Sequence, residues 1–474
     1  MDSISLSDII KAIDGKLINT DPGINIKGVS TNTRSLKQGE IFFALDGKNY
    51  DGHKFIKQAI DKGAIGVIVS NTKKNEYFSF KGLEKCVLIE VADTLKALGD
   101  LASYYRQCLR TRFVAITGSN GKTTTKDMVY HVLKNFKNVS RSRNSHNNFV
   151  GVPLTIFETD RTHDFCVVEM GTNAPGEIKR LSKIISPNFT ILTNIAHAHL
   201  EGLGSIEGVA DEKAEFIENM DKNGTLITNT DDYWCNQISS RFNGRIISFG
   251  FKENVQIRAS KVKRNKSGFV FTVNGSFPIT LPVLGKHNIY NSLATIAVCS
   301  AIGINIEEIC KKFSDFKLPS MRMEKQICGD IVIINDSYNS NPSSMLAALD
   351  EFSQLPVPGR KILVCGDMLE LGEEAEKQHK QIGEKVAKAK IDVLLTVGPF
   401  SGFVAEGAID GGMPSENVLS YKTSEEICYF VASLLKSKDT ILIKGSRKMK
   451  LESVLHQIKN CCSEEKTVRS HSRV

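Results

Sequence analysis

The sequence lacks the features of a secreted or membrane protein. No run approaches the roughly 18 apolar residues of a membrane-spanning helix. The N-terminal stretch MDSISLSDIIKAIDGKL has neither the basic start nor the apolar core of a signal peptide. The 11 cysteines form no C-x-x-C pair and no metal-knuckle spacing. We therefore expect reduced thiols, a cytoplasmic location and no membrane association.

Aromatic residues are also scarce, at 7% of the chain, and they do not interleave with the lysines and arginines that give a formal net charge of +8. Nucleic-acid-binding surfaces usually gather basic and aromatic side chains on one face, so we expect no nucleic-acid partner. The excess charge is expected to form a solvated surface that attracts small anionic substrates.

Alternating apolar strands and helices predict an α/β protein of three domains. Residues 1–84 are expected to form a small N-terminal α/β domain. Residues 85–318 are expected to form a central ATPase domain with a mostly parallel sheet, entered through a linker helix within 85–112. A second alternating set without a dinucleotide fingerprint predicts a Rossmann-like C-terminal domain over 319–474.

A glycine-rich loop follows the apolar strand expected at 113–117 and precedes a helix. Glycines let successive backbone N–H groups face phosphate oxygens, and the helix N-terminus adds a positive dipole end. Lys122 is expected to bridge the β- and γ-phosphates of ATP, and the Thr123 hydroxyl to reach Mg²⁺. The predicted ATP-binding loop consists of Gly118, Ser119, Asn120, Gly121, Lys122, Thr123 and Thr124.

Two metal-ligating residue types follow neighbouring strands of the same expected sheet. Glu169 closes the strand at 165–170, and His199 follows the strand at 189–195. The carboxyl ends of parallel strands share one sheet edge, where ligands bind. A lone Glu or His is more often a surface or structural residue, but this pairing beside a phosphate loop predicts a Mg²⁺ site.

The shortened loop T-G-S-N-G-K-T-T, with Ile116 in place of the first glycine of the general pattern, resembles the ATPase domain of Mur ligases and folylpolyglutamate synthetases. The resemblance to Mur ligases spans nearly the whole chain. It is carried by VSTNTRSLKQGEIFFALDGKNYDGHKFI (29–56), NNFVGVPLTIF (147–157), EMGTNAPGEI (169–178), GKHNIYNSLATIAV (285–298), INDSYNSNPSSMLAAL (334–349) and VCGDMLELGEEAEKQH (364–379).

This resemblance implies a monomeric ATP-dependent ligase whose substrates are ATP, UDP-N-acetylmuramoyl-tripeptide and D-alanyl-D-alanine, with an acyl phosphate as intermediate. Residues 1–84 would bind the UDP end. The implied substrate contacts are Ser30, Thr33, Arg34, Asp51, Gly52, His53, Asn147, Asn148, Tyr338, Asn339 and Asn341. Asn32, Asn144 and Ser145 depart from the family pattern, which usually has Asp, Gly and Asn at these positions.

The resemblance also implies roles that spacing cannot supply. Lys213 matches a lysine that carries a carbamate in Mur ligases, and it would hold a second Mg²⁺ together with Glu169 and His199. The implied metal set is therefore Thr123, Glu169, His199 and Lys213, and the catalytic set is Lys122, Lys213, His199 and Arg322.

The third domain and the helix before it would complete the nucleotide site. By the same resemblance, His287 and Asn291 would contact adenine, Arg322 the γ-phosphate or acyl phosphate, and Asp336 the ribose. Lys444, Ser446 and Arg447 end the last expected strand and could also face the cleft.

Three alternatives stay open at this point. The nearest is a sibling Mur ligase or a folylpolyglutamate synthetase. The uridine-like segment argues against the folate enzyme, and YNSNP argues against the tripeptide-forming Mur ligase. A GTPase or transport ATPase would need its own recognition loop, and N-K-x-D is absent. The last alternative is a non-catalytic sensor of UDP-muramoyl peptides, which would not need the intact set Lys122, Thr123, Glu169, His199 and Lys213.

Overall fold

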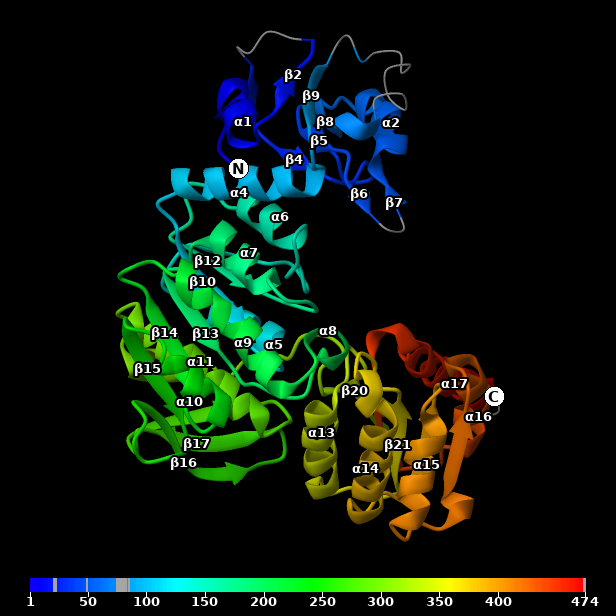
Figure 1. Ribbon diagram of the computed structural model, residues 1–474. Helices are drawn as coiled ribbons and strands as arrows, with labels where there is room; N and C mark the ends of the chain where they lie inside the picture. Colours follow the sequence, from blue (N-terminus) through cyan, green and yellow to red (C-terminus); the bar gives the residue numbers. More distant parts are fainter. Residues whose placement is uncertain (20–23, 48–49, 74–82, 84–85, 472–474) are drawn as a thin grey trace.

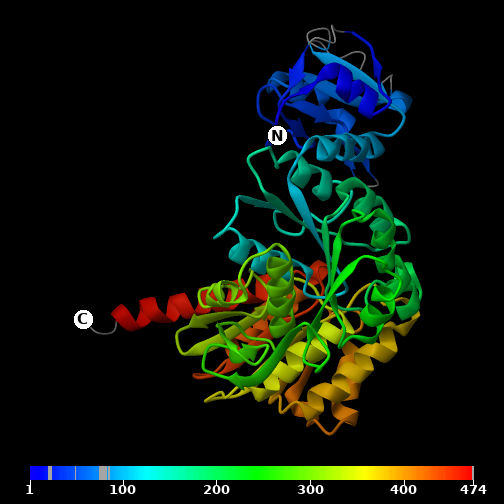
Figure 2. The same cartoon turned by 90° about the vertical axis from the view of Figure 1, so that its left-hand side faces the viewer.

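The computed structural model describes residues 1–19, 24–47, 50–73, 83 and 86–471. It forms three α/β units that follow one another along the chain (Figure 1). The N-terminal unit stacks on one end of the central unit, and the C-terminal unit lies beside the other end. Figure 2 shows the same order from the side. The predicted α/β class with mostly parallel sheets is confirmed.

The N-terminal domain is built on a five-stranded sheet. In sheet order its strands are β2 (Lys16–Leu17), β9 (Val87–Val91), β8 (Gly66–Ser70), β5 (Ile41–Phe43) and β4 (Val29–Ser30). Around it lie β1 (Ile4–Ser5), β3 (Asn25–Ile26), β6 (Asp46–Gly47), β7 (Tyr50–Asp51), α1 (Leu6–Ala12), η1 (Gly52–Phe55), α2 (Ile56–Asp61) and η2 (Asn71–Lys73). Because β9 pairs with both β8 and β2, this sheet extends past the expected boundary at residue 84.

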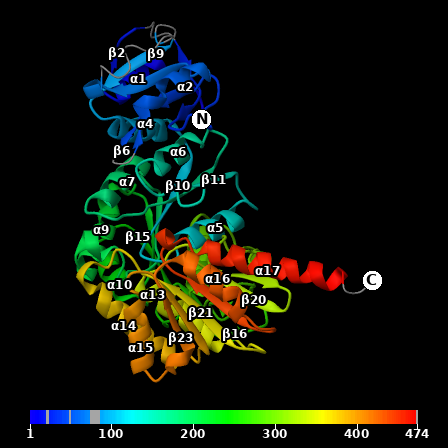
Figure 3. The same ribbon diagram turned by 90° about the vertical axis from the view of Figure 1, so that its right-hand side faces the viewer.

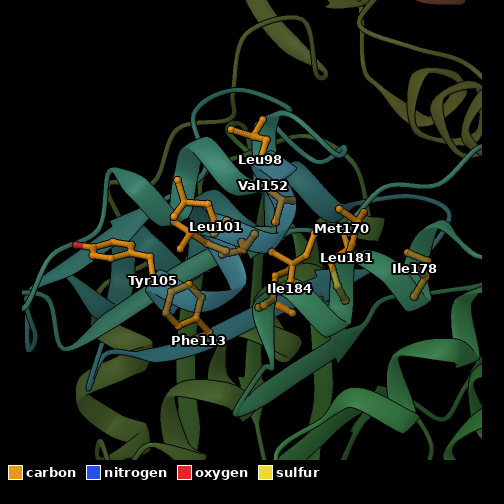
Figure 4. Close-up of a cluster of buried hydrophobic side chains, with 14 of the residues drawn as sticks. Leu98, Leu101, Tyr105, Phe113, Val152, Met170, Ile178, Leu181 and Ile184 are labelled. Carbon is orange, nitrogen blue, oxygen red and sulfur yellow. The ribbon is translucent and has the colours of Figure 1, made fainter. Parts of the chain in front are cut away.

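The helix α4 (Thr94–Cys108) connects this domain to the central one, within the range expected for a linker helix. The Asp93 carboxylate caps its start by accepting hydrogen bonds from the backbone N–H groups of Leu95 and Lys96, at 2.8 and 2.9 Å. The buried face of α4 includes Leu98, Leu101 and Tyr105. In Figure 4 these side chains gather with Val152, Leu181 and Ile184 of the central domain. One continuous apolar core therefore joins the first two domains.

The central domain contains a nine-stranded sheet, parallel from β11 to β16 and antiparallel beyond. Its strands in sheet order are β11 (Val139–Arg141), β12 (Phe165–Glu169), β10 (Arg112–Thr117), β13 (Phe189–Leu192), β14 (Thr225–Asn229), β15 (Arg245–Gly250), β16 (Ile257–Arg264), β17 (Phe269–Val273) and β18 (Phe277–Leu281). Its helices are α5 (Lys122–Leu133), α6 (Gly151–Phe157), α7 (Glu177–Ile185), α8 (Leu200–Leu203), α9 (Ile206–Ala214), η4 (Glu215–Asn219), α10 (Tyr233–Ser239), α11 (His287–Ala301) and α12 (Ile306–Lys311).

The third domain has a six-stranded sheet with apolar cores on both faces. In sheet order the strands are β19 (Glu324–Cys328), β20 (Ile331–Asp336), β24 (Thr440–Lys444), β21 (Lys361–Gly366), β22 (Val393–Val397) and β23 (Val418–Tyr421). Only β19 runs antiparallel to its neighbour among these described strands. The helices are α13 (Pro342–Gln354), η5 (Gly372–Glu374), α14 (Ala375–Lys388), α15 (Ser401–Asp410), η6 (Ser415–Asn417), α16 (Ser424–Leu434), η7 (Arg447–Met449) and α17 (Glu452–His471).

The C-terminal residues differ from the frayed tail that their polarity suggests. The helix α17 continues through His471 and carries the end of the chain away from the domains (Figure 3). No Gly or Pro interrupts the sequence from 452 to 471, so nothing in it breaks a helix. Within the described residues, no helix is long and apolar enough to span a membrane.

Candidate active site

A cavity of about 860 Å³ lies between the central and third domains. The loops that follow β10, β12 and β13 meet segments of the third domain there, as expected for the carboxyl ends of parallel strands. The predicted site residues that line it are Ser119, Asn120, Gly121, Lys122, Thr123, Thr124, Asn147, Asn148, Glu169, His199, His287, Asn291, Arg322, Asp336, Tyr338, Asn339 and Asn341. We call the lining residues that belong to the third domain, Arg322 among them, the third-domain rim.

Two glycines of the phosphate loop occupy positions that other residues could not. Gly118 and Gly121 have φ angles of 136° and 81°, in the region that favours glycine. A Cβ at Gly118 would lie 2.1 Å from Thr193 Oγ1, and one at Gly121 would lie 2.6 Å from Asn291 Oδ1. The loop can therefore pass close to β13 and α11 only with glycine at these positions.

The strand β13 continues into two residues that brace the loop. The Thr193 hydroxyl donates to Asn120 O at 2.7 Å, and the Asn194 amide accepts from Asn120 N at 3.0 Å. The backbone N–H of Ser119 also donates to Asn194 O at 2.8 Å. Neither Thr193 nor Asn194 was predicted from the sequence, although two polar residues at a strand end beside a phosphate loop were an available signal.

Lys122 is the first residue of α5, and its side chain folds back onto the phosphate loop. Its Nζ donates to the carbonyl oxygens of Gly118 and Ser119 at 2.8 and 3.0 Å. Burial lowers the pKa of Lys122. The nearby Glu169 carboxylate raises this pKa and the Arg322 guanidinium lowers it further, so the net shift is downward. The ammonium thus lies within the concave side of the loop, where phosphate oxygens would bind.

Glu169 and Thr123 form a small oxygen-rich cluster beside Lys122. The Thr123 hydroxyl donates to Glu169 Oε2 at 2.8 Å, and the Asn147 amide donates to Glu169 Oε1 at 2.9 Å. Arg322 reaches across from the third domain and donates to Thr123 Oγ1 at 2.9 Å. Within the described ranges, no group of three or more His, Cys, Asp and Glu side chains is arranged to hold a metal. One carboxylate and one hydroxyl nevertheless fit Mg²⁺, which takes much of its shell from phosphates and water.

Lys213 does not line the cavity. It is 0% exposed on α9, and its Nζ has no hydrogen-bond partner among the described residues. Burial, reinforced by the like charge of Lys122, lowers the pKa of Lys213 well below its ordinary value. A lowered pKa favours the unprotonated amine, which is the form that reacts with carbon dioxide, so this environment fits the carbamate implied by the family resemblance.

His199 pairs with a residue of the third domain. Its Nδ1 is 2.7 Å from Glu370 Oε2, and the backbone N–H of Glu201 donates to Glu370 O at 3.1 Å. The hydrogen bond from His199 lowers the pKa of Glu370, although burial opposes the shift. The Glu370 side chain is therefore the acceptor and His199 the donor. The GDMLELG segment contributed to the family resemblance, but no role was predicted for Glu370.

The start of α13 contacts the phosphate loop directly. The Asn341 amide donates to Asn120 Oδ1 at 2.8 Å, and the Asn120 amide donates to Ser343 Oγ at 2.7 Å. Asn341 also caps α13 by accepting from Ser344 N at 2.9 Å. The hydroxyl of Tyr338 contacts that of Ser145, one of the departures from the family pattern. Tyr338 and Asn341, predicted as substrate contacts, thus also connect the two domains.

Several other predicted residues are engaged with protein partners. Asp336 pairs with Lys444 at 2.7 Å, and Lys444 also donates to Asn339 O at 3.1 Å. Asn291 is 4% exposed; its amide accepts from Thr125 and donates to Asn288, so it also supports the packing of α11 on α5.

The predicted uridine-side residues lie in the N-terminal domain and do not line the cavity. Burial alone would raise the pKa of Asp51, but hydrogen bonds from His53 and Lys73 outweigh it and hold the pKa at about 2. His53 is 0% exposed, and both ring nitrogens are engaged, with Asp51 and with Ser70 N. His53 therefore supports this turn rather than offering a free ring nitrogen.

The remaining residues of this predicted group differ in exposure. A Cβ at Gly52 would lie 2.7 Å from Leu45 N, so this glycine allows a close backbone approach. Thr33 donates to Gln58 at 2.6 Å, and Ser30 donates to Asn32 O at 3.1 Å. The side chain of Arg34 is exposed.

All three domains have similar counterparts among known proteins. Family models match residues 25–106 (Mur ligase family, catalytic domain), 116–299 (Mur ligase middle domain) and 321–447 (Mur ligase, glutamate ligase domain). Over 457 residues the chain is 36% identical to UDP-N-acetylmuramoyl-tripeptide–D-alanyl-D-alanine ligase of Bacillus subtilis (strain 168), covering 96% of this chain and 98% of the relative.

Solved structures show the same arrangement of domains. MurF from Acinetobacter baumannii matches with a TM-score of 0.87 at 28% identity, covering 97% of this chain and 99% of that one. MurF from Thermotoga maritima in complex with ADP matches with a TM-score of 0.78 at 24% identity, covering 93% and 98%. Sequence identity at this level over almost the full length, with the phosphate loop facing a third-domain rim, shows that the chain belongs to the Mur ligase family.

Proposed function

We propose that the protein is an ATP-dependent ligase that joins D-alanyl-D-alanine to UDP-N-acetylmuramoyl-tripeptide, forming the UDP-linked pentapeptide precursor of peptidoglycan. The observation that carries this function is the 36% identity to the Bacillus subtilis ligase of that activity, which extends over nearly all of both chains. The reaction takes place in the cavity between the central and third domains, where the phosphate loop lies.

In the first step, a terminal carboxylate oxygen of the tripeptide attacks the γ-phosphorus of ATP. The bond from this phosphorus to the β–γ bridging oxygen breaks, ADP leaves, and an acyl phosphate remains. Two anions approach each other in this step, and Lys122 and Arg322 offset their repulsion. The contact of Arg322 with Thr123 supports this role, because it holds the guanidinium beside the phosphate loop.

In the second step, the amine nitrogen of D-alanyl-D-alanine attacks the acyl carbon. The bond from carbon to the phosphate oxygen breaks, inorganic phosphate leaves, and the nitrogen loses a proton to give the peptide bond. Docking of the third domain excludes water that would otherwise hydrolyse the acyl phosphate.

The proposed metal ligands are Thr123 and Glu169 for one Mg²⁺, with Glu169, His199 and a carbamate on Lys213 for a second. Mg²⁺ would supply positive charge to the phosphate oxygens. The buried, unpartnered Nζ of Lys213 supports the carbamate. His287, Asn291 and Asp336 complete the ATP site; all three line the cavity that also holds the phosphate loop.

The N-terminal domain binds the uridine end of the substrate, and the exposed side chain of Arg34 is available to contact it. The protein works as a monomer in the cytoplasm on small-molecule substrates alone.

The test is a reaction with Mg-ATP, UDP-N-acetylmuramoyl-tripeptide and D-alanyl-D-alanine, in which phosphate release and product mass are followed together. We expect a pentapeptide product only when all three substrates are present. Phosphate release with a different amine, or without the uridine substrate, would assign the chain to another ligase or ATPase activity.

A substitution at the phosphate loop gives a second test. Lys122→Ala is expected to lower kcat by about 10²–10³, as for loss of one preorganised donor in other enzymes. The exposed Lys134→Ala, a few turns along the same segment, is the matched control and should leave turnover unchanged. Turnover of Lys122→Ala near that of the wild type would reject the phosphate-loop assignment.

A further inference from the structure

The contact between His199 and Glu370 joins two loops from different domains. His199 precedes α8 of the central domain, and Glu370 lies in the loop after β21 of the third domain. Both residues line the cavity. Their side chains meet at 2.7 Å, and a backbone hydrogen bond from Glu201 N to Glu370 O lies beside them. Two independent contacts thus hold the loops together at the edge of the proposed nucleotide–metal site.

The backbone at both residues is unusual. His199 has a φ of 58° and Glu370 a φ of 66°, in the left-handed region that non-glycine residues rarely adopt. Such conformations are unfavourable and persist where the surroundings impose them, often at functional sites. An ordinary surface ion pair contributes little to stability and would not require strain on both sides.

The loop that carries Glu370 is fixed by hydrogen bonds to other residues of the third domain. The backbone N–H of Leu369 donates to Ser446 Oγ at 2.9 Å, and that of Met368 donates to His379 Nε2 at 2.9 Å. The position of the Glu370 carboxylate is therefore determined by the third domain, and it moves with that domain relative to His199.

The chemistry of the pair follows from the two ring nitrogens of His199. When Nδ1 donates its proton to Glu370, Nε2 is left with a free lone pair. No described residue of the chain is a hydrogen-bond partner of Nε2. Histidines that bind metals usually donate the other ring N–H to a carboxylate or carbonyl, which fixes the tautomer and the orientation of the ring.

We propose that Glu370 is a positioning residue that orients His199 from the other side of the domain boundary, so that Nε2 is presented to the nucleotide–metal site only when the third domain is docked. This inference rests on the proposed function of the cavity. It links domain docking to completion of the site. His199 is supplied by the central domain, but its ring takes the required orientation only when Glu370 of the third domain is in contact with it.

The experiment measures Mn²⁺ binding by electron paramagnetic resonance in the presence of a non-hydrolysable ATP analogue, so no turnover is needed. Glu370→Ala is expected to weaken Mn²⁺ binding by about 10–100-fold, the usual effect of losing such a partner. Glu370→Gln should bind more tightly than Glu370→Ala, because its amide oxygen can still accept the proton of Nδ1. A melting curve for each variant establishes that it is folded.

One control and one further variant sharpen the test. Glu373→Ala removes a carboxylate from an exposed neighbouring position and should bind Mn²⁺ like the wild type. Glu351→Gln weakens domain docking at a residue that does not line the cavity, so it should weaken Mn²⁺ binding only as far as it opens the junction. The inference is overturned if Glu370→Ala binds Mn²⁺ as tightly as the wild type, or if Glu351→Gln opens the junction in X-ray scattering without weakening Mn²⁺ binding. Pentapeptide formation by the wild type in either case would leave the proposed function intact.

Discussion

The two junctions between domains differ in the kind of contact that forms them. The N-terminal and central domains share one apolar core, in which Leu98, Leu101 and Tyr105 of α4 are almost fully buried. The central and third domains instead meet around the cavity through side-chain hydrogen bonds and ion pairs, such as Arg322 with Thr123 and His199 with Glu370. Their apolar contact includes Leu284 of the central domain, which joins the core of the third domain. Apolar burial favours a fixed arrangement, whereas small polar interfaces between domains allow relative motion. The junction between the N-terminal and central domains therefore keeps a fixed geometry. The junction between the central and third domains can open to admit three substrates and close for the reaction.

Substitutions in the apolar junction should cost the most free energy of unfolding. Leu101→Ala leaves a cavity at a fully buried position, and we expect a loss of about 2–5 kcal/mol in the free energy of unfolding. Urea denaturation measures this loss. The matched control is Leu346→Ala, which removes the same atoms from a side chain that is 39% exposed and should cost much less. Equal costs at the two positions would contradict the shared core.

The loop that leads to Glu370 contains a buried carboxyl, whose effect depends on pH. Burial raises the pKa of Asp367 from 3.8 to about 6. The folded state therefore holds this proton more tightly than the unfolded state, and stability is lost as the pH rises from about 4 to 6. Asp367→Asn should remove that loss and gain roughly 2–3 kcal/mol over the wild type above pH 6. Unfolding free energies of both proteins at pH 4 and 7 test this; an equal difference at both pH values would rule it out.

The polar junction should affect turnover more than folding. Arg322→Lys keeps the charge but loses the planar guanidinium that reaches Thr123. We expect a fall in kcat/KM corresponding to about 2 kcal/mol, the usual worth of a hydrogen bond involving a charged group, with an unchanged melting temperature. Steady-state kinetics with all three substrates measure the effect. A lower melting temperature with unchanged kinetics would show instead that Arg322 is only structural.

The smallest effect is expected at the outer edge of the same junction. Arg264 of β16 forms a two-pronged ion pair with Glu351 of α13, which is 1% exposed. Glu351→Gln avoids leaving a buried charge, so we expect a loss of only about 1 kcal/mol in docking. X-ray scattering should show a larger radius of gyration without nucleotide. Glu253→Gln, which breaks the exposed pair with Arg258 at 3.4 Å, should leave the radius unchanged.

Local patterns in the sequence predicted what depends on neighbouring residues. The strand before the phosphate loop, the helix after it and the parallel sheets follow from hydrophobic periodicity and from glycines next to lysine and threonine. Glu169 at a strand end was also identified, because strand ends in a parallel sheet converge. The braces Thr193 and Asn194 were missed, since their role depends on how close β13 approaches the loop.

Burial and long-range partners could not be read from the same patterns. His53 was predicted as a substrate contact, yet its side chain is fully buried in the structure. Lys213 has no identifiable partner in the sequence because its distinguishing property is burial without a hydrogen bond. Asn341 had a predicted role toward substrate, but its contact with Asn120 requires the third domain to be in place.

The sequence by itself therefore determined the phosphate loop, the order of the α/β domains and the membership of a ligase family. These depend on short-range sterics, periodicity and motifs that persist in any context. The tertiary structure alone decided which side chains meet across the cavity, above all the pairing of His199 with Glu370. That pairing depends on how two separately folded domains dock, and docking is set by surfaces assembled from distant parts of the chain.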